Sequence, residues 1–332
     1  MIEPKAVTYK VVKDMKRSDI LLSMAMDGES LYSGGSSATV FEVQNLEEKP
    51  EDKRKLEGHQ SYITGLTKAG KYLISGAYDK KLIWWDIEKG EKVREIDAHK
   101  RWVRGVEASP DNKLIASVAD DMVARIWDTE SGKLKHELKG HEAYTPNHFD
   151  SMLYCCKFSP DGKILATGDR IGHVVLWDVK TGKQIRTLSA PGVYTWDPRA
   201  RIHSIGGLRS LAFSSDGKTL VIGGMGKVGN IDHLQGKARV ELFDVESAKS
   251  LAVIESDKFK GLVECLEFGP NNDWFLAAGG DHKGWFIFID TKEKKIITQD
   301  QLNTHIHEFK LSEDHNKIHA VGHGLVTVWQ KS

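Results

Sequence analysis

The sequence predicts an all-β fold in which one closed domain is assembled from repeated four-stranded units. The stretch Leu56–Ile96 contains four short apolar segments separated by turn residues, and the same layout recurs over 97–138 and 139–188. A small sheet of this kind cannot bury both of its faces alone, so it needs similar neighbours. Turn sequences such as Ser159-Pro-Asp-Gly-Lys163 separate the first two apolar segments of several copies.

The strongest copies share a histidine near their start and a Trp-Asp pair near the end of the third apolar segment. The opening pairs are Gly58-His59, Ala98-His99 and Gly140-His141, and the closing pairs are Trp85-Asp86, Trp127-Asp128 and Trp177-Asp178. Weaker copies end at Phe243-Asp244, Ile289-Asp290 and Trp329-Gln330. Over nearly the whole chain this pattern resembles the WD40 repeat family, which implies a seven-bladed WD40-type β-propeller.

The expected domain is a single propeller spanning 1–332, with repeats at about 19–55, 56–96, 97–138, 139–188, 189–254, 255–299 and 300–332. The last repeat has room for only three strands, whereas Ala6–Val12 alternates like a strand and has no partner beside it. Propellers of the family commonly complete the last blade with the N-terminal strand. We therefore expect 6–12 to be the outer strand of the last blade, a pairing that removes an exposed edge.

Composition excludes several functional classes. Lysine plus arginine and aspartate plus glutamate both number 47, so the formal net charge is zero, which argues against a protein that coats nucleic acid or an anionic membrane. No signal peptide and no membrane span are recognisable. Cys155 and Cys156 are adjacent on an expected strand, point to opposite faces and form no ligand pattern with Cys265. We expect a cytoplasmic protein with no cofactor and no metal.

Four polar residues fall at matching offsets in the best repeats. They are His59, Ser75, Asp79 and Trp85 in the second repeat, and His99, Ser117, Asp121 and Trp127 in the third. The family resemblance implies that each set forms a buried hydrogen-bonded chain that fixes its blade. A hydrolase triad is the alternative, but the serine would be buried in a strand and the set recurs in each blade. In the fourth repeat Ile171 stands where the aspartate is expected, which puts that chain in doubt.

Insertions are concentrated in the fourth and fifth repeats, at 142–151, 191–207 and 224–237. In the family's geometry these connections emerge on one narrow face, where we expect them to form a wall beside the channel mouth. Their aromatic and basic residues suit a partner interface; packing of Tyr194 and Trp196 onto their own blade is the alternative. The candidate contact residues in them are Tyr144, His148, Tyr194, Trp196, Arg199, Arg201, His203 and His233.

A second set of candidates lies at the starts of the inner strands, where family members often present contact residues around the channel. They are Tyr62, Trp102, Arg104, Tyr154 and Arg209. The blade architecture does not require a tryptophan at 102, so this residue suggests binding, with packing between blades as the alternative. The basic residues, including those of the 199–203 stretch, suit an acidic or phosphorylated partner.

Three patterns suggest other chemistry and are set aside. Gly224–Gly229 spells GxGxxG, but a strand rather than a helix is expected after it. A metal site from His141, His148, His203 and His233 would need irregularly spaced ligands on separate loops. An acid–base site built from Asp150 or Asp197 with these histidines has no fixed geometry in the sequence.

The sequence therefore predicts a non-enzymatic scaffold, a monomeric propeller within a complex, that binds a protein or peptide. The alternative is a propeller enzyme or small-ligand binder with a site at the channel mouth. A deep pocket with converging His148, Asp150 and His203 would favour the ligand hypothesis. A broad surface with exposed Trp102 and Trp196 would favour the protein hypothesis.

Overall fold

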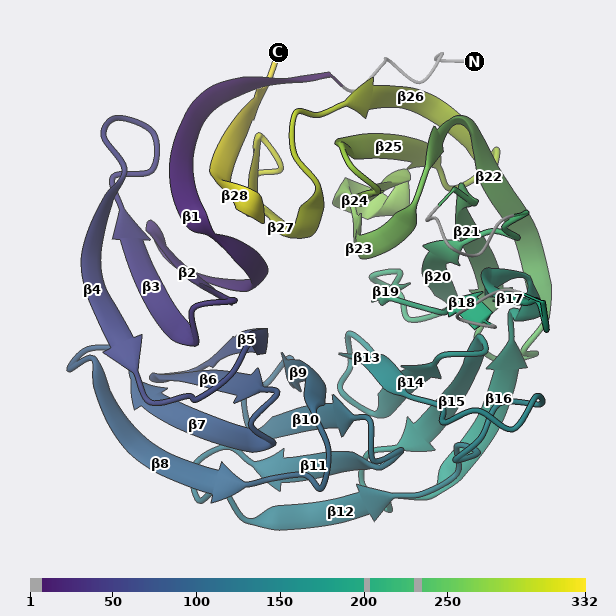
Figure 1. Cartoon of the computed structure of the whole chain (residues 1–332), viewed down its shortest axis with the longest axis horizontal. Coiled ribbons are helices and arrows are strands. Elements are labelled where there is room, and N and C mark those ends of the chain that lie inside the picture. The colour runs from purple at the N-terminus through teal and green to yellow at the C-terminus, as the bar shows by residue number, and fades with distance from the viewer. Residues whose placement is uncertain (1–7, 200–203, 230–234) are drawn as a thin grey trace.

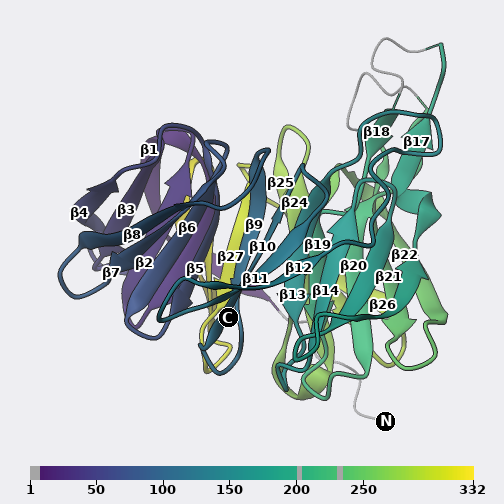
Figure 2. The ribbon, with the colours of Figure 1, turned by 90° about the horizontal axis from the view of Figure 1, so that it is seen from below.

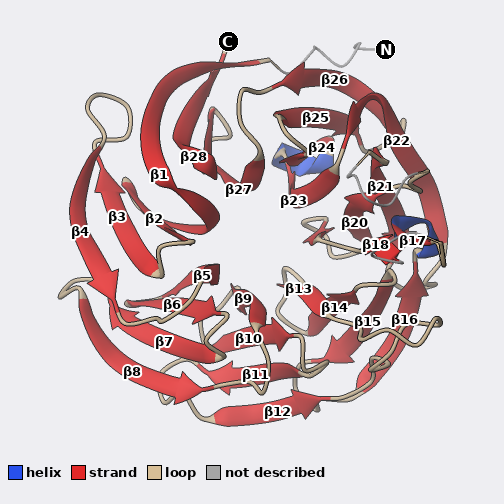
Figure 3. Cartoon of the chain, viewed as in Figure 1, coloured by secondary structure: helices blue, strands red, loops and turns tan. Residues whose placement is uncertain are grey.

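The computed structural model describes residues 8–199, 204–229 and 235–332. Over these residues the chain is almost entirely β-structure, arranged as sheets around a central opening (Figure 1). Two short 3-10 turns, η1 (Pro191–Val193) and η2 (Pro270–Asn272), interrupt the strands (Figure 3). Neither of these described helices is long or apolar enough to cross a membrane. The arrangement is a β-propeller.

Five sheets of four antiparallel strands follow the repeat order. The second repeat forms β5 (Ile63–Ala69), β6 (Tyr72–Ala77), β7 (Lys81–Asp86) and β8 (Glu91–Asp97). The third forms β9 (Val103–Ala108), β10 (Leu114–Ala119), β11 (Ala124–Asp128) and β12 (Leu134–Leu138). The fourth forms β13 (Leu153–Phe158), β14 (Ile164–Asp169), β15 (His173–Asp178) and β16 (Gln184–Ser189).

The fifth repeat forms β19 (Ser210–Phe213), β20 (Thr219–Met225), β21 (Lys237–Asp244) and β22 (Ser250–Lys260). The sixth forms β23 (Leu262–Phe268), β24 (Trp274–Gly280), β25 (Gly284–Asp290) and β26 (Lys295–Gln301). A two-stranded hairpin, β17 (Tyr194–Trp196) and β18 (Ser204–Gly206), lies between the fourth and fifth sheets in sequence. In each four-stranded sheet the chain order is also the spatial order, so consecutive strands pair antiparallel.

The two ends of the chain meet in one six-stranded sheet. Its strands are, in spatial order, β27 (Ile306–Leu311), β28 (Lys317–Lys331), β1 (Tyr9–Asp27), β2 (Ser30–Gly35), β3 (Thr39–Gln44) and β4 (Glu51–Glu57). Residues 9–16 of β1 pair antiparallel with 325–331 of β28, whereas residues 21–27 pair with β2. The N-terminal strand thus joins the last repeat, starting at Tyr9; the expected strand residues Ala6 and Val7 lie outside the described residues.

Hydrophobic clusters fill the spaces between consecutive repeats. One cluster contains Leu73 and Val40 from the second and first repeats, and another contains Leu21 and Val321 from the first and the last. The second of these closes the ring, because it joins the two ends of the chain by packing as well as by strand pairing. Each sheet buries both faces against its neighbours, as the repeat argument requires.

Side chains build the turns that the sequence predicts. The Ser159 hydroxyl donates to Asp161 at 2.7 Å and accepts from the Ile164 amide, while Gly162 takes φ +70°. The aspartate of the Trp-Asp pair has a similar local role: Asp178 accepts the Thr181 amide at 2.7 Å. Carboxylate acceptors of this kind hold tight turns between strands.

Candidate functional site

The innermost strands begin at one face of the ring, which also carries the β17–β18 hairpin, and we call it the hairpin face. Figure 2 shows the hairpin projecting from this face. A central cavity of about 380 Å³ is lined by residues of every innermost strand, including those at the hairpin-face end of each strand or of the part of β1 that pairs with β2. We call this latter set the mouth ring; its members are Leu22, Thr64, Arg104, Tyr154, Arg209, Glu264 and His307.

An aromatic row lies beside the mouth ring on the second and third repeats. Tyr62 stacks on Tyr78 with ring centroids 5.8 Å apart, and Tyr78 stacks on Trp102 at 4.5 Å. Tyr62 and Trp102 are each 47% exposed, so the row presents flat apolar surface to solvent. The sequence predicted the outer two members. It missed Tyr78, which follows β6 and directly precedes the aspartate of the hydrogen-bonded set.

Arg104 is held in place by partners within the chain. Its guanidinium donates two hydrogen bonds, of 2.7 and 2.8 Å, to the buried carboxylate of Asp120, and a third to the Tyr78 hydroxyl. It also lies over the Tyr154 ring, 5.6 Å from the centroid. A bidentate pair of this kind fixes the guanidinium plane. Arg104 was predicted to bind a partner. In the structure its guanidinium is already hydrogen-bonded to Asp120 and Tyr78, and through Tyr78 it supports the aromatic row.

Arg209 has a different environment. Its guanidinium carbon lies 3.6 Å from the centroid of the Tyr154 ring, which is a close cation–π contact. Its Nη1 is buried and has no hydrogen-bond partner among the described residues. Arg209 therefore retains donor capacity at the mouth of the cavity.

The insertions of the fourth and fifth repeats pack on one another. Trp196 of the hairpin contacts Phe149 of the 142–151 insertion, with ring centroids 5.2 Å apart, and the Tyr194 hydroxyl lies 3.5 Å from the Asn147 side-chain oxygen. Val228 of the third insertion donates its backbone amide to the Thr195 hydroxyl of the hairpin. Tyr194 and Trp196 thus contact the neighbouring 142–151 insertion; whether they also pack on their own blade, the alternative considered above, is a separate question.

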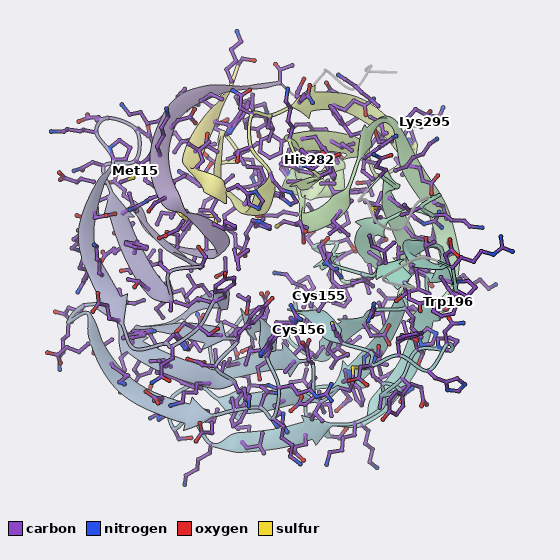
Figure 4. The ribbon with its side chains drawn as sticks, in the orientation of Figure 1. Met15, Cys155, Cys156, Trp196, His282 and Lys295 are labelled. Carbon is purple, nitrogen blue, oxygen red and sulfur yellow. The ribbon has the colours of Figure 1, made fainter. Side chains whose placement is uncertain are left out.

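These insertions stand apart from the mouth ring. In Figure 1 the hairpin lies over the outer part of the ring, and Figure 4 places Trp196 far from Cys155 and Cys156 on the inner strand β13. No described insertion residue lines the central cavity. The expected wall beside the channel mouth is thus a separate raised surface. Arg199 and Tyr144, which is 59% exposed, remain accessible on it, whereas Arg201, His203 and His233 lie outside the described residues.

The hydrogen-bonded chains predicted for the second and third repeats are formed. Trp85 donates its indole N–H to Ser75 at 2.8 Å, Ser75 lies 2.7 Å from His59 Nε2, and His59 Nδ1 lies 2.8 Å from Asp79. In the third repeat, Trp127, Ser117, His99 and Asp121 repeat these contacts at 2.8–3.2 Å. Both serines are fully buried and doubly bonded, so neither is placed to attack a substrate.

The fourth repeat corrects the expectation based on Ile171. Its chain is complete, because Asp169, two residues earlier, lies 3.0 Å from His141 Nδ1, and Thr167 joins His141 to Trp177 at 2.8 Å on each side. Asp169 ends β14 and accepts the amides of Ile171 and His173. The Asp169 carboxylate, at the end of a strand, therefore contacts the same histidine nitrogen, Nδ1, that Asp79 and Asp121 contact from the following turn in the second and third repeats.

Among the described residues, one group could bind a metal ion: Glu264, His305 and His307. Their ligand atoms all lie within 4.8 Å of one another. Burial would raise the pKa of the Glu264 carboxyl, but His305 and other nearby cations hold it at about 2. Burial lowers the pKa of His307 to about 4. For His305 the neighbouring Glu264 outweighs burial, and its pKa is raised.

Comparison with known proteins agrees with the repeat pattern. The family model described as "WD domain, G-beta repeat" matches residues 50–86, 90–128 and 132–178. The chain therefore carries WD40 repeats within residues 50–178. It is 28% identical to mouse telomerase protein component 1 over 83% of this chain and 9% of that protein. It is also 30% identical to rat apoptotic protease-activating factor 1, over 61% of this chain and 15% of that protein.

A third similar protein is nuclear distribution protein PAC1 of Coccidioides posadasii (strain C735), which is 30% identical over 66% of this chain and 44% of that protein. The WD40 chain thus spans less than half the length of these relatives. The similarity to these proteins supports the repeat architecture. The mouth ring, in contrast, is defined only from the structure of this chain.

Proposed function

We propose that this WD40 propeller is a non-enzymatic scaffold that binds a protein or peptide partner on its hairpin face. The observation that carries the proposal is the stacked aromatic row of Tyr62, Tyr78 and Trp102. Aromatic side chains supply large contact areas and are enriched among the residues that dominate binding energy. Because the row is rigidly stacked, little side-chain entropy would be lost when a partner covers it.

The chemistry of the mouth favours an acidic or phosphorylated segment in the partner. Arg209 lies one mouth-ring position from Tyr154 and has a buried Nη1 without a partner among the described residues. Arg209 lines the central cavity, where its guanidinium would form a charge-assisted hydrogen bond with an arriving carboxylate or phosphate; such a bond is stronger than one between neutral groups. The exposed Tyr144 and Arg199 on the insertions would extend the contact surface.

The features that suggested an enzyme do not converge. Asp150 pairs with Arg101 at 2.7 Å, and both side chains are about half exposed. Neither Asp150 nor the exposed His148 lines the central cavity. Among the described residues, the first element after the GxGxxG stretch is the strand β21 rather than a helix, which gives no support to a pyrophosphate site there. These observations support binding rather than catalysis.

We also propose that the six-stranded sheet comprises two blades, which makes the propeller seven-bladed. β27, β28 and the first half of β1 would form the last blade, and the second half of β1 with β2–β4 the first. The packing of Leu21 and Val43 against Val321 and Val328 supports this division, because the two groups meet face to face as neighbouring blades do. A cytoplasmic, monomeric propeller that works within a complex remains part of the proposal.

The proposal is tested by quantitative affinity capture from the native cells with the wild-type chain, Trp102→Ala and Tyr62→Ala. Val93→Ala on the outer strand β8 is the matched control, because Val93 is 48% exposed and far from the mouth. Loss of a central aromatic contact costs about 1–2 kcal/mol or more, which corresponds to roughly tenfold weaker retention. Retention of every partner at wild-type levels by both aromatic variants would refute the proposed surface.

A second arm tests the chemistry of the partner. Arg209→Gln removes the charge while keeping most of the side-chain length, so we expect it to weaken capture of the same partners. Phosphatase treatment of the extract distinguishes the two anions: a phosphorylated partner is lost from the wild type after treatment, whereas a carboxylate-bearing one is retained.

A further inference from the structure

We propose that Glu264, His305 and His307 form a binding site for a divalent transition-metal ion of the zinc type. Glu264 comes from β23, the innermost strand of the sixth repeat, and His307 from β27, the innermost strand of the last. His305 directly precedes β27, and residues two apart along a strand share a face. Neighbouring inner strands therefore bring the carboxylate and both imidazoles together within 4.8 Å at the hairpin face.

Both imidazoles have an unsatisfied nitrogen. The Nε2 atoms of His305 and His307 are buried and have no hydrogen-bond partner among the described residues. His305 is only 4% exposed, so water does not readily compensate. Leaving a buried polar atom unpaired costs about 1–3 kcal/mol, and two such atoms beside one carboxylate call for a shared partner.

The hydrogen bonding of His305 prepares it as a ligand. Its Nδ1 lies 3.3 Å from the backbone carbonyl oxygen of Asp281, and a carbonyl only accepts hydrogen bonds. Nδ1 therefore carries a proton, and in the neutral imidazole this leaves the lone pair on Nε2. Metal-ligating histidines characteristically donate their second nitrogen to a carbonyl or carboxylate in this way. Asp281 lies in the β24–β25 turn next to His282, which Figure 4 places beside β24 and β27.

The spacing also fits a metal better than a direct contact. His305 Nε2 and the Glu264 carboxylate oxygen are 3.7 Å apart, which is too long for a hydrogen bond. Two ligands bound tetrahedrally at about 2.0–2.1 Å would lie roughly 3.3–3.4 Å apart. A metal ion would therefore need only a small inward movement of this pair.

The donor set selects the type of ion. Two imidazoles and one carboxylate suit Zn²⁺ and its neighbours in the first transition row, whereas Mg²⁺ and Ca²⁺ prefer oxygen ligands. Cys265 adjoins Glu264, but successive strand residues point to opposite faces, and its thiol lies 3.7 Å from the Phe309 carbonyl oxygen, to which it donates. Three protein ligands leave a fourth position open, and because Glu264 and His307 line the central cavity, it faces that cavity.

The histidine rings are also held by mutual stacking. The centroids of His305 and His307 are 4.5 Å apart, and the ring of His323, from β28, lies 5.1 and 4.9 Å from them. This packing limits ring rotation, so the two ligand histidines would not need extensive ordering when an ion binds.

The test is titration of the untagged, chelator-treated full chain with Zn²⁺ alone, followed by calorimetry, and with Co²⁺, followed by visible absorption. We expect one ion per chain and cobalt bands typical of a low-coordinate site. Glu264→Gln and His307→Ala are each expected to weaken Zn²⁺ binding at least about tenfold and to abolish the cobalt bands. His148→Ala, an exposed histidine on an insertion, is the matched control and should bind as the wild type does.

Glu264→Gln preserves side-chain shape and guards against loss of folding. Zn²⁺ should raise the melting temperature of the wild type but not of this variant, whose far-ultraviolet circular dichroism should match the wild type. Absence of stoichiometric binding, or equal binding by wild type, Glu264→Gln and His307→Ala, would overturn the proposal. Trp102→Ala should leave Zn²⁺ affinity unchanged, so failure of this site and failure of the proposed partner surface are distinguishable.

Discussion

Replacement of Thr167 by valine tests the role of the hydrogen-bonded chains directly. The Thr167 hydroxyl is fully buried, accepts the Trp177 indole N–H at 2.8 Å and lies 2.8 Å from His141 Nε2. Valine has nearly the same shape, so the substitution leaves no cavity. It removes one oxygen and leaves a donor on Trp177 and an acceptor on His141 without their partner.

The magnitude follows from those two stranded groups. Each buried polar group that loses its partner costs about 1–3 kcal/mol, so we expect Thr167→Val to reduce the free energy of unfolding by roughly 2–5 kcal/mol. This is a large fraction of the 5–15 kcal/mol that is typical of a folded domain. Asp169 would remain bonded to His141 Nδ1 and would keep the ring in place, which makes the lower half of the range the expected one.

Urea unfolding followed by tryptophan fluorescence measures the change as a shift of the midpoint at constant slope. Thr187→Val on the exposed outer strand β16 is the matched control, and it should change the free energy by no more than about 0.5 kcal/mol. Trp177→Phe in the Thr167→Val background should cost less than in the wild type, because the indole N–H has already lost its acceptor. Equal midpoints for Thr167→Val and the control would refute the reasoning.

Three further outcomes are expected. The pKa of Asp79 is lowered despite burial, because His59 and backbone amides hydrogen-bond the carboxylate. Its contribution is thus present above the unfolded pKa of about 4 and is lost as the pH falls through the lowered folded pKa, so the urea midpoints of wild type and Asp79→Asn should differ at pH 6 and approach each other as the pH falls below about 4. Lys294 has φ +55°, where the equivalent turns of the second to fourth repeats have glycine, so Lys294→Gly should raise stability by about 0.5–1 kcal/mol in the same assay. Arg170 donates to Ser204 at 2.7 Å, so Arg170→Ala should speed limited proteolysis within the β17–β18 hairpin while changing the urea midpoint by less than about 1 kcal/mol.

The parts of the fold that the sequence predicted are those set by local chemistry. The Trp-Asp pairs and the Ser-x-Asp-Gly turns mark strands and turns because their side chains bond to backbone only a few residues away. The pairing of the N-terminal strand with the end of the chain also followed, since an unpaired strand and a missing strand complement each other. Once the repeats and their order were known, it followed that each repeat packs against the next one in the chain.

The parts that the sequence missed depend on where side chains point after the ring closes. A fixed offset from Thr167 led to Ile171, although the carboxylate that completes the chain belongs to Asp169, because a strand end and its following turn occupy nearly the same place. Glu264 and His305 are 41 residues apart in the chain (305 − 264), and only the adjacency of β23 and β27 brings them together. The pairing of Arg104 with Asp120 could not be anticipated from spacing, since other residues in the same loops were equally available.

Comparison of the internal repeats shows which positions are shared between blades and which differ. Turn positions carry the same residue types from one repeat to the next, because the backbone geometry demands them. The mouth ring sits on the same backbone framework, yet its seven members include an apolar residue, two arginines, a glutamate and a histidine. No architectural rule explains that variety, since six members lie at or beside the start of an inner strand and Leu22 lies at the start of the part of β1 that pairs with β2. Figure 1 shows β9, β13 and β19 side by side in one arc of the ring, and β23 and β27 in the next. Arg104, Tyr154 and Arg209 belong to or adjoin the first three strands, and Glu264 and His307 belong to the other two. The same geometric position thus provides side chains of different charge around one cavity. If the proposed function holds, this asymmetry would favour one orientation of the bound partner.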